Sequence, residues 1–255
     1  MSMIPMGSHP ATRWLVSKNE VDLSRHDPRP ARRIRVAAEP QNVTIDLTRT
    51  AVIIVDMQND FCAKGGYLDY RGVDYTVDRK PIEPLKKLVP LLRAQKVPVI
   101  WLNWGVRPDL LNISPSLLHA HTQDGCGAGL GETIPGGAPI LKKGGWGAQI
   151  VDELNPGDQD IPVTKHRFSG FWDTELNSIL RNMGISTLFF AGVNADQCVM
   201  TTLEDATFLG YDVLMMEDCV ATTSPAFCMQ ATVYNVKLLF GFMTTSTALI
   251  EGMGA

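Results

Sequence analysis

The stretch Ser186-Thr-Leu-Phe-Phe-Ala-Gly-Val-Asn-Ala-Asp-Gln-Cys198, followed by Val-Met-Thr-Thr-Leu-Glu-Asp-Ala206, indicates the fold of this chain. An apolar run over 188–191 ends at Gly192, which is typical of a buried strand in a parallel sheet. Apolar residues then recur at helical spacing from Val199 to Ala206, which predicts a helix that begins near Cys198. At such a strand-to-helix junction, amide N–H groups and the helix dipole favour a thiolate. The alternative is a buried structural cysteine, a common environment for free thiols.

The same alternation of apolar strands and amphipathic helices recurs along the chain. Strands are predicted over 50–55, 97–102, 161–164, 188–191, 211–216 and 240–243, and helices over 82–92, 174–182 and 226–239. This order predicts a three-layer α/β/α fold with a mainly parallel, Rossmann-like sheet of about six strands. Neither a Gly-x-Gly-x-x-Gly turn nor a P-loop follows the first strand, so we expect no nucleotide cofactor.

Composition narrows the function classes. The 255 residues, 45% hydrophobic and 20% charged, fit one globular domain, and a net charge of -4 argues against nucleic acid or an anionic membrane as partner. No apolar run approaches the roughly 18 residues of a membrane span, and no signal peptide is recognisable. The five cysteines are odd in number and include no CxxC pair, so we expect a cytoplasmic protein without structural disulfides or zinc.

Residues 1–45 differ from the rest of the chain. They contain several prolines and five arginines between positions 25 and 35, with little periodicity. We interpret them as an N-terminal arm that is solvated or wraps around another subunit. A basic tail for nucleic acid is the less favoured alternative, because aromatic residues are not interleaved with the arginines.

Three ionisable residues follow predicted strands directly or closely: Asp56, Lys165 and Cys198. The carboxyl ends of parallel strands meet at one edge of the sheet, where ligands bind in open α/β folds, so these side chains should converge. Taken singly, each residue has a non-catalytic explanation: Asp56 as a carboxylate that caps a turn, and Lys165 as a solvated surface lysine. The irregular segment 103–145 is long enough to form a lid or a pocket wall.

Three blocks of sequence around these residues resemble the signatures of the isochorismatase-like cysteine hydrolases. The blocks are Asp56-Met-Gln-Asn-Asp-Phe61, Lys165-His-Arg-Phe-Ser-Gly-Phe171 and Gly192-Val-Asn-Ala-Asp-Gln-Cys-Val199. The resemblance covers about residues 48–250, within a hydrolase domain that we place at 46–255. Blocks at 65–69, 143–154 and 167–174 resemble the ureidoacrylate amidohydrolases, whereas 107–110 and 127–131 resemble the biuret and triuret hydrolases.

The resemblance implies a role for each catalytic candidate. Cys198 would be the nucleophile that forms a thioester, Asp56 the proton carrier, and Lys165 the cation that stabilises the thiolate. It also implies a cis peptide bond between Val193 and Asn194, with the backbone N–H groups of Asn194 and Cys198 forming an oxyanion hole.

Metal chemistry is not expected from the resemblance. Metal-dependent nicotinamidases of this superfamily carry an Asp-x-His pattern after the second strand, where this chain has Asn103-Trp-Gly105. His119 and His121 lie nearby without a third ligand, so we interpret them as loop histidines and expect no metal site.

The expected function is hydrolysis of a C–N bond in a small ureido or carbamoyl compound, of the ureidoacrylate type, with release of ammonia or a carbamate. Alternatives are a biuret or triuret hydrolase, an N-carbamoyl amino acid amidohydrolase and a nicotinamidase-like enzyme. A non-enzymatic metabolite binder would not need the three ionisable residues. A homo-oligomer, dimer or tetramer, is expected from the family.

Eight residues are candidates for binding the substrate: Gln58, Phe61, Asn103, Arg107, Trp146, Arg167, Phe168 and Trp172. A substrate carboxylate would require a cation, for which Arg107 and Arg167 are available. Biuret has no carboxylate and would instead use neutral groups such as those of Asn103, Gln123 and Asn194.

Overall fold

A computed structural model describes residues 3–25, 27–122 and 125–254 of the chain. Its centre is a six-stranded sheet in which every pair of neighbouring strands is parallel. In spatial order the strands are β11 (Phe242–Thr244), β10 (Asp212–Val220), β9 (Thr187–Gly192), β6 (Thr50–Val55), β7 (Val99–Trp104) and β8 (Ile161–Lys165). The predicted three-layer α/β/α class and the six-stranded parallel sheet are confirmed.

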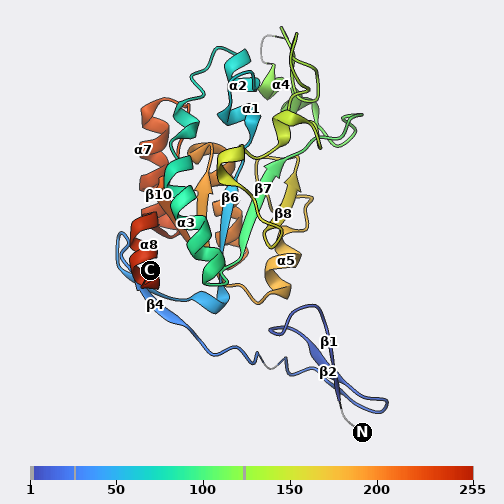
Figure 1. The fold of residues 1–255 in the computed structure, drawn as a ribbon, viewed down its shortest axis with the longest axis vertical. Helices are drawn as coiled ribbons and strands as arrows, with labels where there is room; N and C mark the ends of the chain where they lie inside the picture. The colour runs from blue at the N-terminus through green and yellow to red at the C-terminus, as the bar shows by residue number, and fades with distance from the viewer. Residues whose placement is uncertain (1–2, 26, 123–124, 255) are drawn as a thin grey trace.

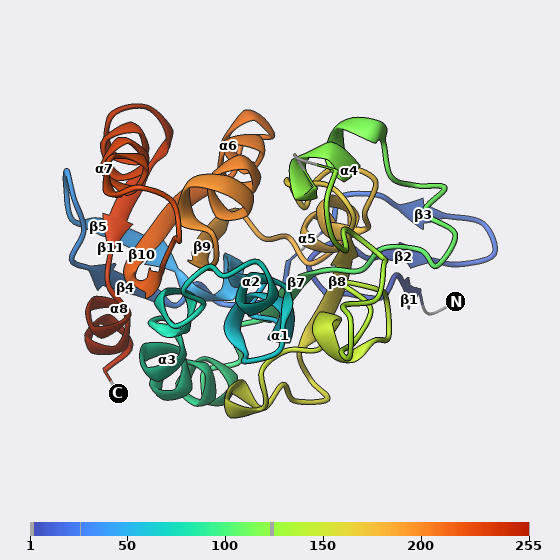
Figure 2. The same cartoon turned by 90° about the horizontal axis from the view of Figure 1, so that it is seen from above.

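Helices cover both faces of this sheet. Figure 2 shows α3 (Ile82–Ala94) and α8 (Ser246–Met253) on one face, with α6 (Met200–Phe208) and α7 (Ala226–Asn235) on the other. The central strands β6 and β9 are buried at every residue, because helices cover them on both sides. This burial explains why both strands appear in the sequence as continuous apolar runs.

The remaining helices are short and lie mostly in connections. They are α1 (Asn59–Cys62), α2 (Tyr67–Tyr70), α4 (Pro115–His121), α5 (Leu176–Asn182) and the 3-10 turns η1 (Leu47–Arg49), η2 (Val77–Arg79), η3 (Trp146–Ala148) and η4 (Asp152–Leu154). In Figure 1, α1, α2 and α4 lie at the end of the molecule opposite the N-terminal arm.

Several boundaries differ from those predicted. A π-helical turn, η5 (Ala195–Val199), precedes α6, so the helix that follows β9 begins before Cys198. A second π-helical turn, η6 (Val236–Phe240), ends the helix predicted over 226–239. The irregular segment 103–145 contains the helix α4, and α8 had no counterpart among the predicted elements. Local periodicity does not reveal π-helical turns, and it revealed α5 but not the similarly short α4 and α8.

The register of β6 and β9 aligns the ends of the two strands. Val55 pairs with Gly192 across the sheet. Gly192 has φ +106, and a Cβ atom there would lie 2.0 Å from the carbonyl oxygen of Val55, so only glycine fits. The next residue after Val55 is Asp56, whose φ of +52 turns the chain sharply at the end of β6. Asp56 and the turn before Cys198 therefore leave the sheet at the same level.

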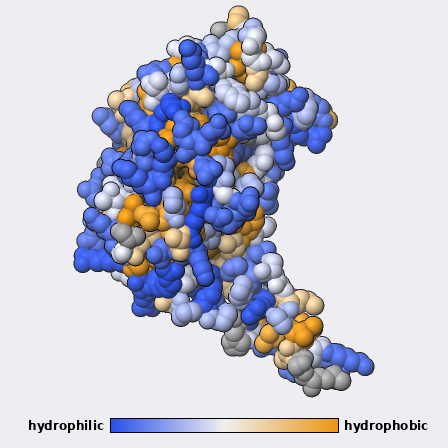
Figure 3. Space-filling view, in the orientation of Figure 1, coloured by the Kyte–Doolittle hydropathy of each residue, from blue (hydrophilic) through white to orange (hydrophobic). Residues whose placement is uncertain are grey.

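The first 46 residues contain more regular structure than the sequence predicts. Strands β1 (Ile4–Met6), β2 (Trp14–Val16) and β3 (Val21–Asp22) form an antiparallel sheet, and β4 (Arg33–Val36) pairs with β5 (Val43–Asp46). The β4–β5 hairpin packs against α8, whereas the β1–β3 sheet projects from the body (Figure 1). This sheet exposes apolar side chains, which Figure 3 shows at the lower end of the molecule. A division of the chain at residue 45, and contact with another subunit, stay predictions.

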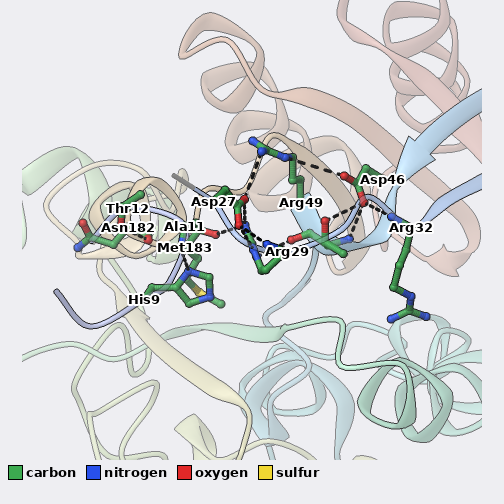
Figure 4. Close-up of polar contacts among 11 residues, drawn as sticks. His9, Ala11, Thr12, Asp27, Arg29, Arg32, Asp46, Arg49, Asn182 and Met183 are labelled. Carbon is green, nitrogen blue, oxygen red and sulfur yellow. Dashed lines mark hydrogen bonds and ion pairs between the residues drawn. The ribbon is translucent and has the colours of Figure 1, made fainter. Parts of the chain in front are cut away.

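Arg29 anchors the projecting arm to the body. Its guanidinium donates hydrogen bonds to the carbonyl oxygens of Thr48 at 2.6 Å and Met183 at 3.2 Å, and it pairs with Asp27 at 2.9 Å (Figure 4). The hydrogen bonds from the Arg29 guanidinium to the Asp27 carboxylate lower the pKa of Asp27 to about 2. Thr12 adds a hydrogen bond to the carbonyl oxygen of Asn182 at 2.6 Å.

We expect Arg29→Ala to release the arm without unfolding the sheet. Charged hydrogen bonds of this kind contribute about 1.5–3 kcal/mol each, so chymotrypsin should cleave at Trp14–Leu15 about 10-fold faster or more. The Asp27 contribution is present above about pH 4, near the unfolded pKa, and is lost as the pH falls toward the folded value of about 2. Arg33→Ala is the control, since Arg33 is exposed on β4. Equal cleavage rates in both variants would contradict the anchor.

Candidate active site

Asp56, Lys165 and Cys198 meet at the carboxyl ends of β6, β8 and β9. Lys165 Nζ lies 2.9 Å from Asp56 Oδ2 and 3.3 Å from Cys198 Sγ, so the ammonium group bridges the other two. The exposed fractions are 1% for Asp56, 0% for Lys165 and 5% for Cys198. The three side chains converge as predicted. The carboxylate partner offsets the cost of burying the lysine charge.

Trp104, at the end of β7, contacts all three of these side chains. Its indole N–H donates to Cys198 Sγ at 3.4 Å, its backbone N–H donates to Asp56 Oδ1 at 3.2 Å, and its ring lies 4.1 Å from Lys165 Nζ. An ammonium group over an indole face is a favourable cation–π contact. Trp104 was not among the predicted site residues, although it follows the candidate Asn103 directly.

Gln58 holds Trp104 in place. Its Oε1 accepts the Trp104 backbone N–H at 2.8 Å, and its Nε2 donates to the carbonyl oxygens of Trp104 at 2.8 Å and Ala148 at 2.7 Å. Gln58 was predicted to bind substrate, but its buried amide group makes three backbone hydrogen bonds instead. In this structure Gln58 positions Trp104.

Burial controls the protonation of the cluster. It raises the pKa of Cys198 to about 12, with the Asp56 carboxylate adding to the rise while Lys165 and the Trp104 N–H oppose it. Burial also raises the pKa of Asp56, against the opposing effect of Lys165. Desolvation therefore opposes the thiolate that a helix end was expected to favour, and it outweighs the effect of the Lys165 ammonium group.

The loop before Cys198 contains the cis peptide bond between Val193 and Asn194 that the resemblance implied. The side-chain oxygen of Asn194 accepts a hydrogen bond from the Thr223 backbone N–H at 2.8 Å. The backbone carbonyl oxygen of Asn194 accepts another from the Val199 N–H at 3.2 Å. Asn194 is buried, so its side chain fixes the loop that carries the nucleophile. An oxyanion hole formed by the backbone N–H groups of Asn194 and Cys198 stays a prediction.

An aromatic wall surrounds this cluster. Phe168 packs edge-on against Trp104 with ring centres 5.9 Å apart, and it stacks on His121 at 6.3 Å with an interplanar angle of 11°. Tyr67 lies 5.9 Å from the His121 ring, and its hydroxyl donates to the His121 carbonyl oxygen at 2.7 Å. Phe168 was a predicted site residue, whereas Tyr67 was missed and His121 was interpreted as a loop residue. His121 is instead the last residue of α4.

The other substrate-binding candidates have different surroundings. Arg107 pairs with Asp109 at 2.7 Å on the surface, and Arg167 pairs with Asp173 at 2.5 Å. Trp172 is exposed and donates its indole N–H to Asp205 on α6 at 2.7 Å. Of the rest, Phe61 is buried in α1, Trp146 is exposed in η3, and Asn103 has a buried side-chain oxygen without a hydrogen-bond partner among the described residues. Gln123 lies outside the described residues.

Within residues 3–25, 27–122 and 125–254, no three histidine, cysteine, aspartate or glutamate side chains are grouped to hold a metal ion. In the same ranges, no helix has both the length and the apolar character needed to cross a membrane.

Comparison with known proteins identifies the family. A family model described as an isochorismatase domain matches residues 50–248. The chain is 35% identical over 212 residues to the ureidoacrylate amidohydrolase RutB of Klebsiella variicola (strain At-22), covering 83% of this chain and 89% of that protein. A solved cysteine hydrolase from Pseudomonas syringae pv. phaseolicola 1448A has a TM-score of 0.70 and 26% identity, covering 89% of this chain and 98% of that one. The N-carbamoylsarcosine amidase from Thermoplasma acidophilum has a TM-score of 0.59 and 27% identity, covering 78% and 96%.

The chain belongs to the isochorismatase family, as the match over 50–248 shows. Within that family it is a hydrolase that acts on carbon–nitrogen bonds other than peptide bonds. The resemblance inferred from the three sequence blocks is confirmed.

Lys165→Met should destabilise the fold, because it leaves the Asp56 carboxylate buried without a cation. Breaking a buried pair in this way costs about 3–5 kcal/mol of unfolding free energy, measured by urea denaturation at pH 7. Since protonation of Asp56 removes the unpaired charge, the loss should be smaller at pH 5 than at pH 8. The Asp56→Asn/Lys165→Met double variant should be more stable than the sum of the single changes predicts.

Lys237→Met is the matched control, because Lys237 forms a surface pair with Glu39 at 3.0 Å. Surface pairs of this kind contribute at most about 1 kcal/mol. If Lys165→Met destabilised the protein no more than Lys237→Met does, the buried ion pair would not be what holds the site together.

Proposed function

We propose that this chain is a cysteine amidohydrolase that cleaves a small ureido or carbamoyl compound through a thioester intermediate. The observation that carries the proposal is the Lys165 ammonium group, which lies within 3.3 Å of both the Cys198 sulfur and the Asp56 carboxylate. This arrangement supplies a nucleophile, a base and a cation in one buried cluster. A protein that only bound a metabolite would have no need of it.

The proposed reaction begins with Cys198 as a neutral thiol. Asp56 removes the thiol proton as Cys198 Sγ attacks the substrate carbonyl carbon, and the developing oxyanion is bound by the N–H groups of Asn194 and Cys198. Asp56 then donates that proton to the departing nitrogen, which leaves a thioester. A water molecule, deprotonated by Asp56, hydrolyses the thioester and restores the thiol. The raised pKa of Asp56 supports this role, because the carboxyl group must both take and return a proton.

A ureidoacrylate-like compound is the substrate that the relatives favour. The curated relatives named ureidoacrylate amidohydrolase are 35–38% identical to this chain over more than four-fifths of its length. With a ureido substrate, hydrolysis of the acyl-enzyme releases a carbamate, which decays to ammonia and carbon dioxide. A biuret or triuret hydrolase is the second candidate, supported by the blocks at 107–110 and 127–131.

The location, oligomeric state and cofactor requirement of the enzyme stay predictions. We propose a cytoplasmic homo-oligomer, a dimer or tetramer, that acts without a cofactor on a small molecule. An N-carbamoyl amino acid is a further substrate class, because the N-carbamoylsarcosine amidase shares the fold at 27% identity.

Cys198→Ala should lower kcat by about 10³-fold or more while the protein keeps its melting temperature within a few degrees, because the nucleophile is removed and the cavity is small. Ammonia release from ureidoacrylate is the assay. Cys228→Ala, on α7, is the control and should retain full activity. Substantial turnover by Cys198→Ala would exclude the thioester route.

Arg107 and Arg167 test whether the substrate carries a carboxylate. If either binds it, alanine there should raise KM for ureidoacrylate about 10-fold or more, since a charged hydrogen bond contributes roughly 1.5–3 kcal/mol, and should leave biuret unaffected. Arg33→Ala controls for the loss of a surface charge. A wild-type preference for biuret, with neither arginine affecting ureidoacrylate, would instead favour the second candidate.

A further inference from the structure

His121, at the end of α4, packs against Trp104 of the catalytic cluster. Its ring centre is 5.8 Å from that of Trp104, whose indole N–H contacts Cys198 Sγ at 3.4 Å. Ser114 caps the other end of α4 by accepting the Leu117 N–H. His119, on the same helix, is exposed, so the two histidines have different surroundings.

A hydrogen bond determines the tautomer of His121. Nδ1 lies 2.8 Å from the carbonyl oxygen of Leu117, one helical turn earlier. A carbonyl oxygen only accepts, so Nδ1 must carry the hydrogen atom, and Nε2 of the neutral ring is left as an acceptor. Among the described residues Nε2 has no hydrogen-bond partner. Burial and the Lys165 charge lower the pKa of His121, which keeps the ring neutral near pH 7.

Hydrogen-bond donors predominate among the side chains that contact Cys198. Lys165 Nζ and the Trp104 indole both present hydrogen-bond donors, and the proposed oxyanion hole adds two more. Asp56 is committed to Lys165 and to the Trp104 backbone N–H. A primary ureide, H₂N–CO–NH–R, has an NH₂ group beside its carbonyl. This NH₂ group loses its bound water when the ureide enters the site, and a buried donor without a partner costs about 1–3 kcal/mol.

We propose that His121 Nε2 accepts a hydrogen bond from the NH₂ group of the substrate, and that it thereby selects compounds with a terminal H₂N–CO group. This inference rests on the proposed function and narrows its substrate class. Phe168 and Tyr67 position the imidazole, by stacking on its ring and by bonding to its backbone carbonyl oxygen. Selection occurs at the acyl part of the substrate, which remains on the enzyme as the thioester, so the leaving group is free to vary.

The test compares two esters that share a leaving group. 4-Nitrophenyl carbamate carries NH₂ where 4-nitrophenyl acetate carries CH₃, and acylation by either releases nitrophenolate. His121→Phe keeps an aromatic ring but removes the acceptor, so acylation by the carbamate should slow about 10- to 100-fold and acylation by the acetate less than about 3-fold. His121→Gln restores an acceptor and should recover most of the carbamate rate. His119→Phe is the control and should match the wild type with both esters.

Two results would overturn the inference: equal slowing of both esters in His121→Phe, which indicates a packing role, or a His121→Gln variant as slow as His121→Phe with the carbamate. Hydrolysis of ureidoacrylate and biuret by the wild type is measured in parallel. If neither compound reacted, the proposed function would be contradicted. The comparison of the carbamate with the acetate would still measure the effect of the His121 acceptor on acylation. A change confined to the carbamate therefore supports the inference separately from the choice of ureide.

Discussion

The ion pair between Lys165 and Asp56 is the constraint on which the rest of the site depends. Both side chains are at most 1% exposed, so each charge has lost its water. Desolvating an isolated ion costs several kcal/mol, and this cost is offset only when the opposite charge is close and well oriented. The 2.9 Å contact provides that charge, and the Trp104 ring covers the ammonium group from one side. The cluster can exist only where several chain segments deliver these groups together.

The parallel sheet meets this requirement. Because β6, β7, β8 and β9 all run in one direction, their carboxyl ends deliver Asp56, Trp104, Lys165 and the Cys198 turn to one edge. The close approach of Gly192 to Val55 lets β9 end level with β6. Gln58 then links β6 to β7 through the Trp104 backbone. Strand register and neighbouring backbone therefore bring the reactive residues to one level, and the contacts of Lys165 with Asp56 and Trp104 then position its ammonium group.

This dependence explains which parts of the site could be predicted from the sequence. Asp56 and Lys165 directly follow or end apolar runs, so the edge at which they meet follows from the strand order alone. Trp104 could not be selected in this way, because both faces of a buried strand are apolar and the pattern does not show which side chain turns toward the cysteine. His121 is brought to the site by the tertiary path of 103–145, and the β1–β3 sheet depends on pairing between segments that carry no strong strand pattern.

The resting protonation state follows from the same burial. With a pKa of about 12, forming the Cys198 thiolate at pH 7 by releasing a proton to water would cost about 7 kcal/mol. Transfer to Asp56, whose pKa burial raises, instead keeps the proton inside the site, since the thiol becomes an anion as the carboxylate becomes neutral. The net charge beside Lys165 is then the same before and after the transfer, and the ammonium group only changes which anion it faces. A buried site can therefore generate a nucleophile when the carbonyl is in place, and the thiol stays unreactive when it is not.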